Sequence, residues 1–166
     1  MKASDEAEFT EFATATIRRL RRTAYLMCGD WHRAEDAAQD ALVKVYRRWH
    51  RIDRTQGLNG YAHQCLVTAV FDQSRKSWRR ERLVDTEEPL APLPDPAGAV
   101  DDRTLVVQAL RALPPSQRAC VVLRHYADFS LEQTADVLGI GTGGVKSQTS
   151  RGLTRLREVL GERTPS

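Results

Sequence analysis

Residues 130–156 have the sequence SLEQTADVLGIGTGGVKSQTSRGLTRL, and this stretch decides the fold class. Ser130 and Gln133 form an S-x-x-Q capping box, which predicts the start of a short helix. Gly139 permits a left-handed turn residue, and a longer basic helix follows, with Val145 on its apolar side. Two helices joined by so tight a turn predict a helix-turn-helix.

The second helix of this motif has polar and basic side chains near its N-terminal end. The candidate DNA-reading residues are Thr142, Lys146, Ser147, Gln148 and Arg151. An ordinary helical hairpin with a basic face is the alternative interpretation. The string GIGTGGVKS at 139–147 misses the phosphate-binding loop G-x-x-x-x-G-K-S by one residue and follows a helix, which argues against nucleotide hydrolysis.

Upstream of the motif, the sequence predicts two further helices, which are preceded by a linker. Helix signals cover residues 102–112 and 115–126, and Pro115 suits a first helical turn. Residues 84–101 combine four prolines with acidic residues and contain no basic residue, which predicts an extended linker. The acidity of the linker has two open interpretations, a solvated tether or a mimic of nucleic acid.

The N-terminal half shows three helical patterns. Apolar residues recur at three- and four-residue steps from Glu8 to Met27, and Gly29 with Asp30 predicts a stop followed by a new helix cap. A second apolar stripe covers residues 34–49, and a third helix follows a turn in which Asn59 is the expected cap. No strand pattern competes. The sequence therefore predicts an all-α protein with domains at residues 1–83 and 102–166, joined by the linker at 84–101.

Two surfaces of the N-terminal half are candidates for binding. The second helix has a polar face with an acidic start and a basic end, formed by Asp36, Gln39, Asp40, Lys44 and Arg47; a solvated surface gives the same pattern. The third helix interleaves aromatic and basic residues that could stack splayed bases and hold a strand: Tyr61, His63, Arg75, Trp78 and Arg79. Packing in the core is the alternative for the aromatic ones.

Composition excludes several other classes. The formal net charge of the 166 residues is only +3, so total charge is weak support for a nucleic-acid partner. Cys28, Cys65 and Cys120 are far apart and form no CxxC pair, which argues against a disulfide framework or a zinc site. No arrangement indicates a metal, a cofactor or catalysis. Without an apolar run of roughly 18 residues or a signal-peptide core, we expect a cytoplasmic protein with no membrane insertion.

Two segments together resemble a known family. HRAEDAAQDALVKVYRRWHRI at 32–52 resembles the second conserved region of bacterial sigma factors, and residues 113–160, from LPPSQRACV to LREVL, resemble the fourth. The chain resembles the extracytoplasmic-function group, which keeps only these two domains, and KSQTSR at 146–151 most resembles its actinobacterial branch. The resemblance implies a non-enzymatic factor that binds core RNA polymerase and directs promoter recognition and melting, with an anti-sigma factor as a possible further partner.

The resemblance also assigns roles to the candidate surfaces. It implies that the polar face of the second helix grips the clamp helices of the largest polymerase subunit. It places residues 53–60 in the loop that captures a flipped base of the minus-10 element, and residues 61–80 along the melted strand. The implied minus-10 contacts are Asn59, Tyr61, His63, Arg75, Trp78 and Arg79. The residues at the start of the recognition helix, 142–151, fall where the family contacts the minus-35 duplex.

Two other functional classes remain as alternatives. A stand-alone helix-turn-helix regulator would use the N-terminal helices for dimerisation and would bind a palindrome without polymerase. A purely structural helical adaptor would bind neither DNA nor polymerase. Binding to core polymerase discriminates the sigma factor from both.

Overall fold

The computed structural model describes residues 2–55, 57–83 and 102–163, and it describes the side chains of these residues except 74–83, 102–103 and 162–163. Every regular element in these ranges is helical. The N-terminal half contains α1 (Ala3–Cys28), α2 (Trp31–Arg47), the 3-10 turn η1 (Trp49–Arg51) and α3 (Leu58–Leu83). The C-terminal half contains α4 (Asp102–Arg111), α5 (Pro115–Val121), the π-helical turn η2 (Val122–Tyr126), α6 (Leu131–Leu138) and α7 (Thr142–Arg163). The all-α prediction is confirmed, whereas the predicted linker at 84–101 lies outside the described residues.

A tight turn folds α2 back along α1. Gly29 has φ 72°, and its N–H donates to the carbonyl of Tyr25, which ends α1 in a left-handed cap. The Asp30 carboxylate then accepts hydrogen bonds from the backbone N–H groups of His32 and Arg33 at 2.8 and 3.2 Å. Both predicted signals are confirmed.

The inner face of α2 consists mainly of small side chains. The residues of this face that have no exposed area are Ala34, Ala37, Ala38, Ala41 and Val45. Alanine lets neighbouring helices approach closely, so α2 packs against both α1 and α3. Trp49, just after α2, closes the end of this three-helix layer and is only 2% exposed.

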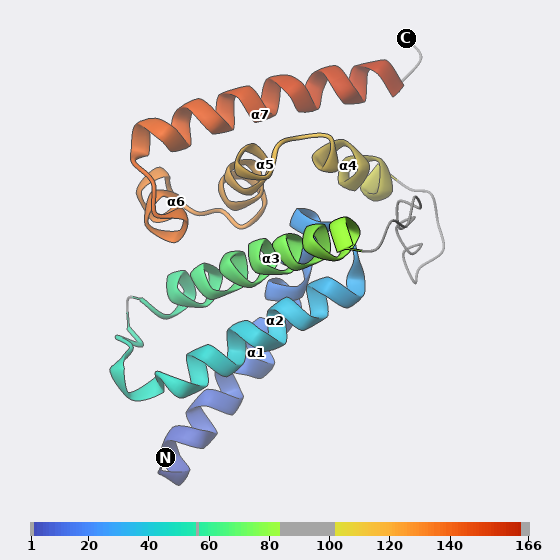
Figure 1. Ribbon diagram of the computed structural model, residues 1–166. Coiled ribbons are helices and arrows are strands. Elements are labelled where there is room, and N and C mark those ends of the chain that lie inside the picture. Colours follow the sequence, from blue (N-terminus) through green and yellow to red (C-terminus); the bar gives the residue numbers. More distant parts are fainter. Residues whose placement is uncertain (1, 56, 84–101, 164–166) are drawn as a thin grey trace.

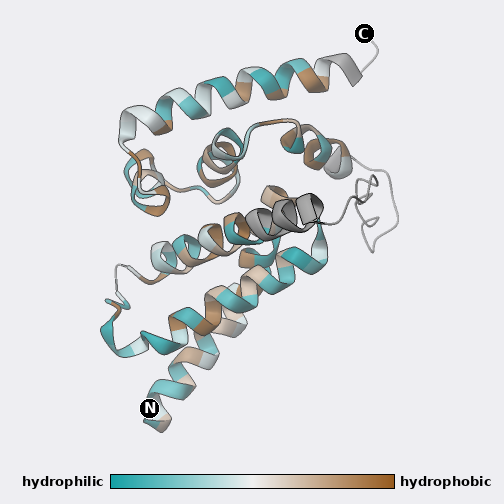
Figure 2. Cartoon of the chain, in the orientation of Figure 1, coloured by the Kyte–Doolittle hydropathy of each residue, from teal (hydrophilic) through white to brown (hydrophobic). Residues whose placement is uncertain are grey.

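The C-terminal half forms a second layer. Figure 1 shows α4, α5 and α6 between the N-terminal layer and α7, which lies on the outside. Apolar and polar residues alternate along the helices in Figure 2, as expected for helices that bury one face. The π-helical turn after α5 widens the backbone, and Asp128 takes φ 59° before Phe129 enters the core.

The helix-turn-helix has the predicted local geometry. Ser130 Oγ accepts from the N–H of Gln133 at 3.0 Å, and Gln133 Oε1 accepts from the N–H of Ser130 at 2.8 Å, which completes the capping box. Gly139 has φ 68° and ends α6. Val145 has no exposed area and anchors α7 against Cys120 and Ala135.

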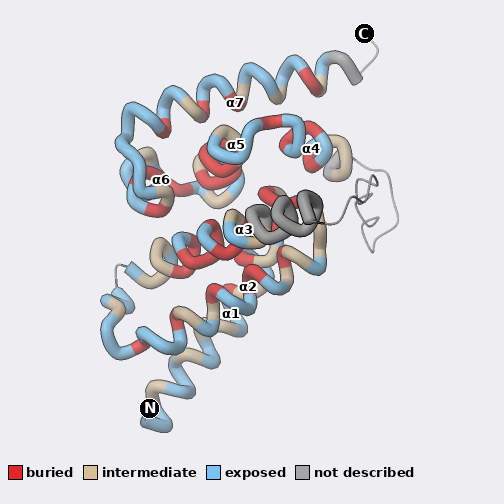
Figure 3. The backbone as a smooth tube through the Cα atoms, viewed as in Figure 1, coloured by how far each residue is buried: buried red, intermediate tan, exposed pale blue. Residues whose placement is uncertain are grey.

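One hydrophobic core runs through both halves of the molecule. It extends from Leu20 and Leu66 in the N-terminal layer to Leu123 and Phe129 in the C-terminal layer. Figure 3 shows that buried residues gather on α3 and α5, where the layers meet. The two halves therefore form one packed unit in this structure, rather than two bodies joined only by a tether.

Two helix starts differ from the sequence prediction. α3 begins at Leu58, so Asn59 lies inside the first turn and is not the cap; its carbonyl instead pairs with Nδ1 of His63 at 2.9 Å. α1 begins at Ala3, five residues before the Glu8 at which the apolar pattern starts. Contacts distant in sequence involve the first turns of α1, as described below.

Candidate polymerase and DNA interfaces

The polar face of α2 is on the molecular surface. Asp36, Gln39, Asp40 and Arg47 are exposed and Lys44 is half-buried. Asp40 and Lys44 form an ion pair at 3.2 Å, one helical turn apart. The structure brings the five predicted residues together on one side of α2, opposite its alanine face.

Sequence reasoning missed two apolar residues on this same surface. Val43 is 46% exposed and Tyr46 is 39% exposed, among the largest exposures of big apolar side chains in the described residues. Val43 is three residues from Asp40 and three from Tyr46, so the side chains follow one stripe of the helix. An exposed apolar strip bordered by charges is typical of a protein-binding surface. Periodicity could have found it, since both residues lie off the buried stripe.

The predicted minus-10 residues have different environments. Asn59 is exposed, and Tyr61 is half-buried; burial and then a hydrogen bond with Cys65 raise the pKa of Tyr61. The side chains of Arg75, Trp78 and Arg79 lie outside the described residues. Within the described part of the chain, the structure therefore supports an exposed position for Asn59 and a partly exposed one for Tyr61.

His63 does not face solvent in this structure. Its ring has no exposed area and meets the ring of Phe129, from the other half, edge to face at 4.7 Å between centroids. Burial, which outweighs the opposing hydrogen bond with the Asn59 carbonyl, lowers the pKa of His63; the positive charge of Arg19 also lowers it. The expected contact of His63 with DNA is therefore not possible while the halves are packed together, because Phe129 covers the ring.

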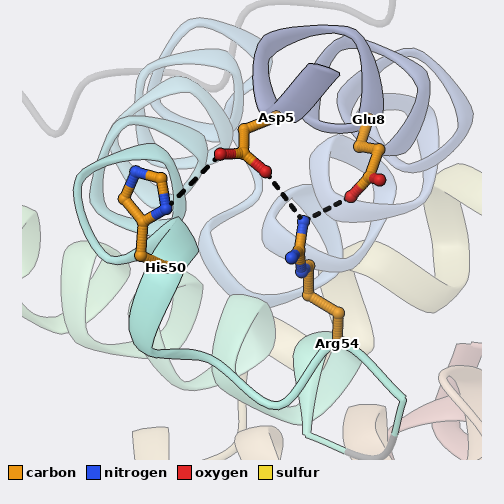
Figure 4. Close-up of polar contacts among 4 residues, drawn as sticks. All are labelled: Asp5, Glu8, His50 and Arg54. Carbon is orange, nitrogen blue, oxygen red and sulfur yellow. Dashed lines mark hydrogen bonds and ion pairs between the residues drawn. The ribbon is translucent and has the colours of Figure 1, made fainter. Parts of the chain in front are cut away.

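The loop between α2 and α3 is anchored to the first turns of α1. Asp5 lies 3.5 Å from Nδ1 of His50 and 3.6 Å from Nη1 of Arg54, and Glu8 pairs with the same Arg54 nitrogen (Figure 4). The guanidinium also lies over the ring of Trp49, 5.1 Å from its centroid. Sequence reasoning missed this cluster, because partners about fifty positions apart show no local signal.

The start of α7 presents a continuous polar surface. Thr142, Lys146, Ser147 and Arg151 are exposed and Gln148 is half-buried, whereas Val145 and Thr149 point into the protein. Ser147 and Arg151 are four residues apart and lie one above the other on the helix. Within the described residues, neither Lys146 nor Arg151 forms an ion pair. In the described part of the chain, the charges of Lys146 and Arg151 are therefore available to a ligand.

No metal or membrane feature is found in the described ranges. No group of three or more His, Cys, Asp or Glu side chains there could hold a metal ion. No described helix is long and apolar enough to cross a membrane.

Comparison with known proteins assigns the family. Residues 12–80 match the family model for sigma-70 region 2, and residues 109–158 match that for sigma-70 region 4. The RNA polymerase sigma-E factor of Streptomyces coelicolor is 36% identical over 157 residues, covering 92% of this chain and 86% of that protein. The extracytoplasmic-function sigma factor SigM of Mycobacterium tuberculosis is 30% identical, covering 96% and 80%. The chain belongs to the extracytoplasmic-function group of sigma factors.

Solved structures of sigma factors share its fold. The sigma factor RpoE of Bartonella quintana, solved with the anti-sigma factor NepR, matches with a TM-score of 0.78 and 28% identity, covering 92% of this sigma factor and 96% of RpoE. CnrH, solved with the cytosolic domain of CnrY, matches with a TM-score of 0.70 at 16% identity, which shows the fold alone. This sigma factor therefore directs promoter recognition by RNA polymerase, and the stand-alone regulator is not favoured.

Proposed function

We propose that this sigma factor binds core polymerase through the polar face of α2 and reads promoter DNA with two separate surfaces. The observation that carries the proposal is the stripe on α2, where charged residues border the exposed Val43 and Tyr46. The polymerase makes the RNA, and the chain supplies specificity without catalysis of its own. We place it in the cytoplasm, because its partner acts on the chromosome there.

The test of the core-binding face is co-elution of the full chain with bacterial core RNA polymerase on size exclusion. Asp40→Arg should abolish co-elution, because it breaks the pair with Lys44 and puts a positive charge where the partner is expected to be basic. Glu11→Arg is the matched control, since Glu11 is exposed on α1 and lies outside the proposed face. Retained co-elution of Asp40→Arg would remove the case for this face.

The loop after α2 and the start of α3 are the proposed minus-10 surface. Asn59 and Tyr61 border this loop, and the basic residues Arg75 and Arg79 follow on the same helix. Extruding a base from the stack costs a few kcal/mol, which contacts with such a loop would have to offset. This surface belongs to the N-terminal half.

The start of α7 is the proposed minus-35 surface. Polar side chains at the N-terminal end of a recognition helix can reach base edges in the major groove, and Arg151 can hold a phosphate. The exposure of Lys146, Ser147 and Arg151, with Val145 holding the helix from behind, supports this role. This surface belongs to the C-terminal half.

With its two halves packed together, the protein is too small to contact the minus-10 and minus-35 elements at the same time. The minus-10 and minus-35 elements are about 25 base pairs apart, or about 85 Å along B-form DNA. A compact chain of this length is roughly 40 Å across. We therefore propose that the halves separate on binding polymerase, which also uncovers His63. Fluorophores on α2 and α7 should move apart when core polymerase is added; an unchanged distance in the complex would contradict the opening.

An anti-sigma factor is a proposed partner of the packed form. The RpoE neighbour was solved with the anti-sigma factor NepR, and it matches this chain across both halves. A protein that stabilised the packed form would keep both DNA-reading surfaces from their elements. Such a partner is expected to compete with core polymerase, and simultaneous binding of both would argue against this role.

A further inference from the structure

The first two turns of α1 contact the loop that follows α2 through a cluster of charges. Figure 4 shows the carboxylate of Asp5 between the His50 ring on one side and the Arg54 guanidinium on the other. Glu8 approaches the same guanidinium from the next turn of the helix. The side chain of Asp5 is only 16% exposed, whereas that of Glu8 is 57% exposed. Asp5 is thus the enclosed centre of the cluster, where screening by solvent is weakest.

Aromatic rings support the same loop from the core side. Trp49 is buried, and Arg54 lies over its ring. Phe9 meets the Trp49 ring edge to face at 5.4 Å, and Phe12 lies 5.9 Å from it. Residues of α1 therefore contact both Trp49, where the loop begins, and Arg54 within the loop.

Arg54 adjoins a set of hydrogen bonds that leads into α3. The neighbouring Asp53 carboxylate accepts from the N–H of Thr55 at 3.0 Å, and the Asp53 carbonyl accepts from the N–H of Gly57 at 2.9 Å. The carbonyl of Gly57 in turn accepts from the N–H of Tyr61 at 2.9 Å. Fixing Arg54 thus restrains a continuous set of hydrogen bonds that ends in the first turn of α3.

The acidic members of the cluster precede the residues matched by the region 2 family model. The match to sigma-70 region 2 begins at residue 12, so Asp5, Glu8 and Phe9 all precede it. Arg54, by contrast, lies within that match. The anchor therefore joins residues that precede the matched region to a loop within it.

We propose that Asp5 and Glu8 are positioning residues for minus-10 recognition, which hold the base-capturing loop in one geometry through Arg54. The inference rests on the proposed function of that loop. Carboxylates repel phosphates, so neutralising them by itself tightens non-specific binding of a DNA strand. Release of Arg54 has a different consequence, because a loop without its anchor discriminates less between bases. Overall affinity and base preference should thus change in opposite directions.

The test uses holoenzyme assembled from the full chain and bacterial core polymerase. A single-stranded DNA pool with a randomised window is selected on wild-type holoenzyme, and the affinities of the selected strand and its single-base variants are measured. One mismatch at a recognised position commonly costs about fivefold or more in affinity. In Asp5→Asn with Glu8→Gln, we expect this discrimination to be largely lost, while binding of the unselected pool is equal or tighter.

The matched control is Glu6→Gln with Glu11→Gln. It removes the same charge from the same helix, and neither side chain belongs to the Arg54 cluster. This control should keep the wild-type base preference. Arg54→Ala should lose the preference, and adding the Asp5 and Glu8 changes to Arg54→Ala should cause no further loss of base preference. Co-elution with core polymerase checks that each variant folds. If the double variant at Asp5 and Glu8 does not fold, Asp5→Asn alone replaces it in the test.

The outcomes separate the inference from the function on which it rests. If wild type selects a motif and the Asp5 and Glu8 double variant discriminates equally well, the positioning role is wrong and the loop's function stands. A further loss of discrimination in the Arg54→Ala background would show that the carboxylates act other than through Arg54, which also overturns the inference. If wild-type holoenzyme selects no motif, the proposed function of the loop fails, and the inference fails with it.

Discussion

Nη1 of Arg118, in α5, lies 2.6 Å from the carbonyl oxygen of Met27, in the last turn of α1, and donates a hydrogen bond across the two halves. The same guanidinium donates to the carbonyls of Leu110 and Leu113 at 2.9 Å each. One arginine therefore satisfies carbonyl groups of the α4–α5 corner and also ties that corner to the N-terminal half. Burial lowers the pKa of Arg118, yet a guanidinium remains protonated at neutral pH.

Removal of this arginine should destabilise the whole chain. Arg118→Met keeps most of the apolar stem but leaves the carbonyl acceptors without their donor, and each hydrogen bond to a charged group contributes about 1.5–3 kcal/mol. We expect the free energy of unfolding to fall by about 3 kcal/mol in urea titrations. Arg155→Met is the control, because it removes only an exposed pair with Glu158 and should change stability by about 0.5 kcal/mol or less. Equal stability of Arg118→Met and wild type would contradict the role of Arg118.

The stability of the packed form should fall in acid because of His63. Its folded-state pKa lies below 6.5, so between that lowered value and 6.5 the unfolded chain binds more protons than the folded one. The stability contributed by neutral His63 is therefore complete above pH 6.5 and is lost as the pH falls below it. His63→Gln should reduce the pH dependence of the unfolding midpoint relative to wild type between pH 7.5 and 5. His125→Gln is the control, because it removes an exposed histidine. An identical pH dependence of the unfolding midpoint in wild type and His63→Gln would contradict the prediction.

Two glycines of α7 should respond oppositely to alanine. A Cβ on Gly152 would lie 2.7 Å from Cγ2 of Val121 and 3.2 Å from the carbonyl oxygen of Gln117, where α7 packs on α5. Overpacking of this kind costs about 1–3 kcal/mol, which exceeds the gain in helix propensity of up to about 1 kcal/mol. Gly152→Ala should therefore lower stability. Gly161→Ala meets no atom within 4 Å and should leave stability equal or higher. Thermal unfolding of both variants checks the prediction, and a stabilised Gly152→Ala would show that α5 and α7 can move apart.

Arg151 should contribute to binding of the minus-35 duplex. Arg151→Ala is expected to weaken binding of a selected promoter fragment by about 1–3 kcal/mol, and a phosphate contact would reduce the salt slope by about 1. Arg18→Ala removes an equal charge from an exposed position on α1 and serves as the control. Fluorescence anisotropy with holoenzyme at several salt concentrations measures both quantities. Unchanged affinity and slope would remove Arg151 from the proposed interface.

Local signals in the sequence were sufficient for most helix boundaries. The caps at Asp30 and Ser130 and the left-handed turns at Gly29 and Gly139 all depend on hydrogen bonds between residues at most four positions apart. Such interactions are encoded by neighbouring residue types, so a pattern predicts them. The polar stripe of α2 and the exposed start of α7 follow in the same way from helical periodicity.

Long-range contacts decided what periodicity could not. The hydrogen bond between Arg118 and Met27 joins residues 91 positions apart, and Arg54 pairs with Glu8 across 46 positions. The first two turns of α1 make the contacts of Asp5 and Glu8 with the loop after α2, which local apolar spacing does not reveal. The burial of His63 under Phe129 likewise depends on how the halves pack, since a histidine on a helix has no intrinsic preference for DNA or core.

By itself, the sequence determined an all-α chain with two helical halves, a capped helix-turn-helix and the family to which it belongs, because these features reside in local residue patterns. Only the tertiary structure decided that the halves share one core, that His63 is enclosed between them and that the N-terminus anchors the loop before α3. Those features come from side chains that meet only after the backbone has folded, and no spacing along the chain specifies which distant surfaces will fit together.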